Sequence, residues 1–212
     1  SESSSASTPA LNGSSSNGRI VSIVLGSFRI KVPEGTEGAV TRENKEGKVV
    51  NELIFSELSG YIKNIVMEDT KYGQQVKFTI QADKTYTLSM GYSDGLTSSI
   101  FKMLPNVDPT QPVTFTVTRK MDDVKKKEIT SIFMSQNDAP VKWYYTKAEP
   151  NGLPPFEKIM VKGKEQWDNT VQLQFLWDNA VLGFIERLSE KPALKDNGFT
   201  DFELGAIADV EF

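Results

Sequence analysis

The side chains in this sequence best suited to binding chemistry are aromatic rings set among lysines, and residues 142–147 (KWYYTK) show the pattern most clearly. Flat rings stack on nucleobases of any kind while nearby ammonium groups neutralise phosphates. The same run could instead form an aromatic hairpin that plugs a barrel. Residues of these types make up the candidate nucleic-acid-binding set: Tyr61, Lys63, Tyr72, Lys77, Tyr86, Tyr92, Arg119, Lys142, Trp143, Tyr144, Tyr145 and Lys147.

Few residues suit enzymatic chemistry, because the chain contains no cysteine and no histidine. Thiol nucleophiles, disulfides, histidine triads and Cys/His zinc sites are therefore excluded. The adjacent acid pairs Glu68-Asp69 and Asp122-Asp123 could ligate Mg²⁺, but both fall in expected turns and no nucleotide-binding loop accompanies them. We expect a binding protein with no catalytic residue, metal or cofactor. A carboxylate-dependent nuclease is the enzymatic rival.

The charge is distributed unevenly along the 212 residues, whose formal net charge is -4. Residues 189–212 hold six acids and two bases, so this end carries an excess equal to the whole net charge. Residues 112–164 hold ten bases and six acids, a modest basic bias that suits either a phosphate-binding surface or a solvated face. No apolar run approaches the roughly 20 residues of a membrane span, and no signal peptide is recognisable, so we expect a cytoplasmic protein.

Hydrophobic periodicity predicts one domain over residues 19–188, flanked by a disordered Ser-rich arm at 1–18 and an acidic tail at 189–212. Residues 34–52 are expected to be a loop and residues 138–168 an irregular insertion. Alternating apolar residues predict strands, with bends at Gly26 and Gly60, over 19–33, 57–68, 74–82, 85–93, 112–120 and 128–137. A 3.6-residue period predicts helices over 94–107 and 170–188.

The order of the main elements is three strands, a helix and two strands, which is the order of the OB-fold. We therefore expect a mainly β protein. It would be a five-stranded OB-type barrel with a helix between strands three and four, an extra N-terminal strand and a C-terminal helix. An SH3-like barrel lacks a helix of this length, and a β-sandwich needs about seven strands. The apolar face of the helix over 170–188 would either cover the barrel or form the seam of a homo-oligomer.

The end of the chain sets acids between apolar residues, in Asp201-Phe202-Glu203-Leu204 and Asp209-Val210-Glu211-Phe212. With the strand order of 54–137, this end resembles phage and bacterial single-stranded DNA-binding proteins, which carry an OB domain, a linker and an acidic tip that often finishes in phenylalanine. The resemblance implies sequence-independent binding of single-stranded DNA in replication, recombination or repair. It also implies that Asp209, Glu211 and Phe212 recruit replication or recombination proteins and compete with DNA for the basic groove.

The resemblance implies a phage origin, and hence the cytoplasm of an infected bacterium, because the N-terminal strand and the long insertion depart from bacterial housekeeping forms. A second reading of the same sequence is a virion structural or decoration β-protein, which a Ser-rich arm and a small barrel also suit. Affinity for single-stranded DNA separates the two, since a coat component needs none.

Overall fold

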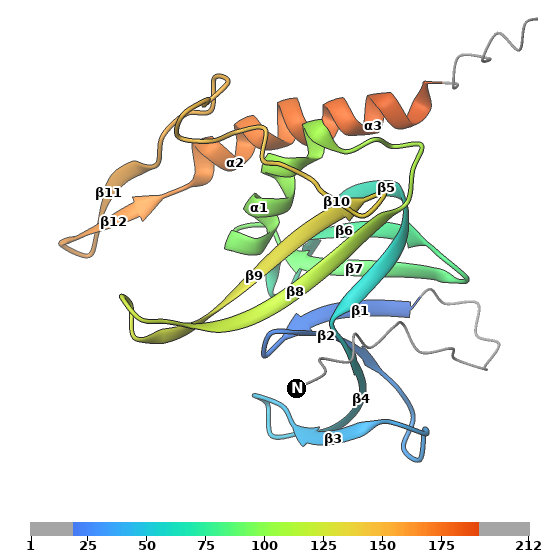
Figure 1. Cartoon of the computed structure of the whole chain (residues 1–212). Coiled ribbons are helices and arrows are strands. Elements are labelled where there is room, and N and C mark those ends of the chain that lie inside the picture. The colour runs from blue at the N-terminus through green and yellow to red at the C-terminus, as the bar shows by residue number, and fades with distance from the viewer. Residues whose placement is uncertain (1–18, 191–212) are drawn as a thin grey trace, which may run out of the picture.

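The computed structural model describes residues 19–190, which form a mainly β body with helices packed on it (Figure 1). Ten strands of these residues make one mixed sheet in the spatial order β10-β9-β8-β5-β6-β7-β1-β2-β4-β3. Their bounds are β1 Arg19–Val24, β2 Ser27–Lys31, β3 Val40–Glu43, β4 Val49–Phe55, β5 Glu57–Thr70, β6 Gly73–Gln81, β7 Thr85–Gly91, β8 Val113–Asp122, β9 Lys127–Gln136 and β10 Ala139–Pro140. The expected arm at 1–18 and nearly all of the expected acidic tail lie outside the described residues.

The antiparallel meander β5-β6-β7 and the hairpin β8-β9 form where the alternation predicts them. Val76, Phe78 and Ile80 are fully buried, because every second residue of a strand faces the same side of the sheet. β5 changes partner from β8 to β6 after Gly60, where a Cβ atom would lie 2.6 Å from the carbonyl oxygen of Gln81. The expected strand elements of the central body are therefore confirmed.

The expected closed five-stranded barrel is wrong. β8 pairs with β5, but β7 pairs in parallel with β1, in the register Arg19↔Tyr86 to Val21↔Leu88. Strands β2, β4 and β3 then extend the sheet beyond β1. The N-terminal hairpin takes this position because Val21, Phe28 and Ile30 bury their side chains in the common core.

The β1–β2 hairpin turns at Leu25 and Gly26, both with positive φ, as the expected bend at Gly26 requires. This turn packs on β8, since a Cβ atom on Gly26 would lie 2.5 Å from Cβ of Arg119. The sheet therefore curls until its N-terminal hairpin meets the β8–β9 hairpin, although the strands do not join there.

Residues 34–52, which we expected to be a loop, contain β3 and most of β4. A charged cluster fixes this end of the sheet. Glu52 is 3% exposed and accepts hydrogen bonds from Nη1 of Arg29, at 3.2 Å, and from the guanidinium of Arg42. Burial alone would raise the pKa of Glu52, but the hydrogen bonds and charges of the two arginines outweigh it and lower that pKa.

Helix α1 (Gly95–Met103) begins at Asp94, whose carboxylate accepts from the N–H of Leu96 at 3.1 Å, and continues as the 3₁₀ turn η1 (Leu104–Asn106). The expected C-terminal helix forms as α2 (Thr170–Leu176), a π turn η2 (Trp177–Val181) and α3 (Leu182–Ser189). Its apolar face is buried against the body rather than left open as a seam. No helix within residues 19–190 is long and apolar enough to cross a membrane.

The insertion at 138–168 combines an ordered loop with a separate hairpin of β11 (Glu157–Val161) and β12 (Lys164–Asp168), which pair from Glu157↔Asp168 to Val161↔Lys164. Figure 1 shows this hairpin projecting away from the sheet, beyond the start of α2.

Candidate functional site

The aromatic loop that the sequence singled out lies against α1. Tyr145 is 4% exposed and packs edge-on against Phe175, with 5.8 Å between ring centroids. The neighbouring rings of Trp143 and Tyr144 are exposed, at 43% and 40%. One ring of the run therefore anchors the loop in the core, while the other two face outward.

Hydrogen bonds hold the loop in place. The N–H of Tyr144 donates to the carbonyl oxygen of Lys102 at 2.8 Å, and Nδ2 of Asn106 donates to the carbonyl oxygen of Lys142 at the same distance. Because both partners belong to α1 and η1, the exposed rings are carried by a helix rather than by a free loop. Such support reduces the entropy that a ring loses when it binds a ligand.

The ammonium of Lys102 lies 5.2 Å from the ring centroid of Trp143, within cation–π distance. Lys102 is half-buried, and this burial lowers its pKa. A positive charge is thus held beside an exposed indole by the same helix that positions the loop. No local pattern of residues indicates this pair, because about forty residues separate its members.

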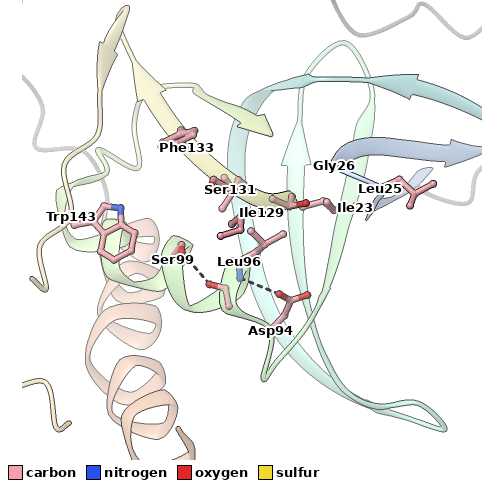
Figure 2. A pocket seen from close by; sticks show the side chains of 13 residues that line it. Ile23, Leu25, Gly26, Asp94, Leu96, Ser99, Ile129, Ser131, Phe133 and Trp143 are labelled. Carbon is pink, nitrogen blue, oxygen red and sulfur yellow. Dashed lines mark hydrogen bonds between the residues drawn. The ribbon is translucent and has the colours of Figure 1, made fainter. Parts of the chain in front are cut away.

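A groove of about 590 Å³ begins at Trp143 and runs between α1, β9 and the β1–β2 turn. Figure 2 shows Trp143 at one end, Leu25 near the other, and Phe133 and Leu96 between them. Phe133 is 52% exposed and stands on the outward face of β9 between Ser131 and Ser135. Sequence reasoning missed Phe133, although an aromatic ring on the polar face of an alternating strand was a visible signal.

A second hollow, of about 430 Å³, lies beside residues 59–63 of β5 and is lined by Tyr61, Lys63, Gln81 and Pro112 among others. Tyr61 is 39% exposed, and Nζ of Lys63 lies 5.1 Å from its ring centroid. These two predicted residues therefore come together. They line a different hollow from Trp143, so the predicted set does not form one continuous site.

Tyr72 and Lys77 are held by contacts within the protein. Tyr72 is 70% exposed at the β5–β6 turn, where its hydroxyl donates to Oε1 of Glu46 at 3.0 Å and Nζ of Lys71 lies 4.9 Å from its ring centroid. Lys77 forms an ion pair with Glu68 at 2.6 Å. A phosphate would compete with that carboxylate for Lys77.

Tyr86 is not available to bind a nucleic acid. Its side chain is fully buried, and burial together with the nearby Asp83 raises the pKa of its hydroxyl. Tyr86 thus belongs to the core, and its place in the candidate nucleic-acid-binding set is wrong. Tyr92 is half-buried, contacts Trp177 edge-on at 6.4 Å between centroids, and has a pKa raised by burial and by Asp178.

The remaining predicted bases lie on the surface. Arg119 pairs with Glu128 at 2.7 Å, while the side chains of Lys142 and Lys147 are exposed. The predicted partner-binding residues Asp209, Glu211 and Phe212 lie outside the described residues. One further pair was missed, because Nζ of Lys158 lies 5.0 Å from the ring centroid of Trp167 on the projecting hairpin.

Comparisons with protein-family models, curated proteins and solved structures find no match. The site must therefore be interpreted from its own chemistry. Within residues 19–190 no group of three or more acidic side chains is arranged to hold a metal ion. What these residues do present is exposed aromatic rings with lysine ammonium groups beside them.

Proposed function

We propose that this chain binds single-stranded DNA without sequence preference and performs no chemistry on it. The observation that carries the proposal is the repeated pairing of an exposed ring with a lysine. It occurs at Tyr61 with Lys63, at Tyr72 with Lys71 and at Trp143 with Lys102, at 4.9–5.2 Å from ammonium nitrogen to ring centroid.

In this proposal each ring stacks on a base, and the lysine beside it neutralises a flanking phosphate. Stacking contributes on the order of 1–3 kcal/mol per base and accepts any base, because every base has a flat face. The phosphate contacts release counterions, so affinity falls as salt rises. Binding to separate surface rings suits an extended strand, which can pass from one ring to the next.

The acidic end of the chain would act beside the DNA-binding surface. Asp209, Glu211 and Phe212 would recruit replication or recombination proteins, and they would compete with DNA for the basic surface. Removing a competing negative segment tightens DNA binding, whereas removing a purely solubilising end leaves affinity unchanged.

Intrinsic tryptophan fluorescence, titrated with an oligo-dT strand at low and high salt, tests the proposal directly. Trp167→Phe with Trp177→Phe leaves Trp143 as the reporter, and a second protein ending after Glu190 tests the tail. We expect quenching that weakens with salt and tightens when the tail is absent. If the fluorescence does not change at low salt, single-stranded DNA binding is rejected. The alternative function, a virion structural or decoration protein, is then favoured.

A further inference from the structure

The hairpin of β8 and β9 extends well beyond the strand that supports it. β8 pairs with β5 only as far as Thr116, whereas its pairing with β9 continues to Asp122. Residues 119–128 form the outer ribbon, in which every residue except Asp122 is exposed. Figure 1 shows this end of the hairpin projecting past the other strands of the sheet. The outer ribbon therefore presents two strands and a turn with both faces in solvent.

The outer ribbon is basic, with five bases and three acids among its ten residues. Two of the acids are already engaged by the ribbon itself. Glu128 pairs with Arg119 at 2.7 Å, and the carboxylate of Asp122 closes the turn by accepting from two backbone N–H groups at 2.8 and 2.9 Å. Asp123 is the third acid. Four lysines of the ribbon form no ion pair within the described chain: Lys120, Lys125, Lys126 and Lys127.

This chemistry suits a polyanion whose bases are already stacked on one another. The outer ribbon contains no aromatic ring, so it cannot supply the base stacking on which single-strand binding depends. An anionic membrane surface is a poorer match, because Met121 and Val124 are the only large apolar side chains that the ribbon exposes and membrane binding grows with buried apolar area. Duplex DNA needs neither rings nor a wide apolar face, since lysines alone neutralise its phosphates.

The dimensions of the outer ribbon match the major groove of B-DNA. That groove is about 12 Å wide and admits a two-stranded ribbon, whose strands lie about 4.8 Å apart. Three intervals of about 3.4 Å separate Arg119 from Asp122, so the paired part of the ribbon is about 10 Å long and exceeds the groove depth of about 8.5 Å. Val124 lies in the turn beyond it and is 92% exposed. The turn can therefore reach the floor of the groove.

We propose that the outer ribbon enters the major groove of duplex DNA, where its lysines contact the phosphates and Val124 contacts the base edges. An apolar side chain can meet the methyl group of thymine there. Lys126 has a φ of 50°, a conformation that glycine or asparagine adopts more readily, so the geometry of the turn does not explain the lysine. The inference does not depend on the proposed single-strand binding, which uses the ring–lysine pairs.

Binding of a blunt-ended DNA duplex, which offers no single strand, tests the proposal with the full-length protein. The ribbon variant removes three phosphate contacts by Lys120→Gln, Lys125→Gln and Lys126→Gln. The slope of log affinity against log salt should become less steep by about 2–3, and affinity at low salt should fall at least about tenfold. The control variant removes the same charge from the other two exposed hairpins by Lys45→Gln, Lys162→Gln and Lys164→Gln, and it should keep the slope of the wild type. All six lysines are exposed, so both proteins should fold.

Val124→Ser should weaken duplex binding a few-fold without changing the salt slope, because it removes an apolar contact and no charge. Oligo-dT affinity should be the same in the ribbon and control variants. An equal loss of oligo-dT and duplex affinity in the ribbon variant would assign the ribbon to the single-strand surface and overturn the proposal. It would also be overturned by a wild type that does not bind the duplex at low salt. Failure of oligo-dT binding alone would reject only the single-strand function.

Discussion

Replacing Trp143 with alanine separates stacking from charge at the ring that α1 positions. The ring is 43% exposed while the loop behind it is anchored by Tyr145, so the substitution removes a surface ring without opening the core. Loss of one stacked base costs about 1–3 kcal/mol, which weakens binding of oligo-dT by roughly 5- to 150-fold. The salt dependence should not change, because the indole carries no charge.

The paired substitution Lys102→Gln should change mainly the salt dependence of binding rather than the affinity at high salt. Removal of one phosphate contact makes the slope of log affinity against log salt less steep by about 0.7 for a single strand, with little loss at high salt. Fluorescence anisotropy of a labelled oligo-dT at several salt concentrations measures both quantities. A Trp143→Ala protein that binds as tightly as the wild type would refute the stacking argument. Trp177→Phe, at a half-buried ring, serves as the control.

Further predictions concern the framework that carries these residues. Glu52→Gln should lower the free energy of unfolding by about 3–5 kcal/mol in urea titration, because it leaves the buried guanidinium of Arg29 without its carboxylate. The lowered pKa of Glu52 means that its stabilisation is present above pH ~4.3 and lost as pH falls through the native pKa. Unfolding curves of the Gln variant should therefore depend less on pH in this range, and an equal dependence would contradict this view. Gly60→Ala should destabilise by about 1–3 kcal/mol, because its Cβ atom meets the backbone of Gln81; unchanged stability would show that this backbone shifts freely to make room.

The strands that alternate cleanly could be predicted from the sequence because each buries one face. Val113, Phe115 and Val117 are nearly or fully buried, while Thr114 and Thr116 between them are partly exposed. This pattern is local, so no knowledge of the partner strand was needed to recognise it.

The pairing of strands could not be predicted in the same way. Both β1 and β9 carry apolar residues, so either strand could pair with the free edge of β7. Packing between distant segments decides which of the two strands pairs there. β3 and most of β4 were not predicted, because charged residues are typical of loops. Here the ion pairs of Glu52 with Arg29 and Arg42 help to hold these strands in the sheet.

For the candidate site, residue types could be read from the sequence, whereas burial and pairing could not. Residue type alone selects Tyr61, Lys63 and Trp143 as candidates, but the burial of Tyr86 depends on which face of β7 meets the core. Lys102 could not be assigned to Trp143 from the sequence, because the fold brings α1 and the loop together. Ring–lysine pairs between distant segments thus become visible only in three dimensions.

The parallel insertion of β1 between β7 and β2 has a consequence for how the chain folds. β1 can form its hairpin with β2 early. Its other edge can pair only after β7 has formed, and β7 lies far along the sequence. Pairings of such long range slow folding. Before β7 has formed, β1 has an unpaired edge that can pair with a strand of another chain. During synthesis, the N-terminal hairpin would therefore be the segment most exposed to misassembly.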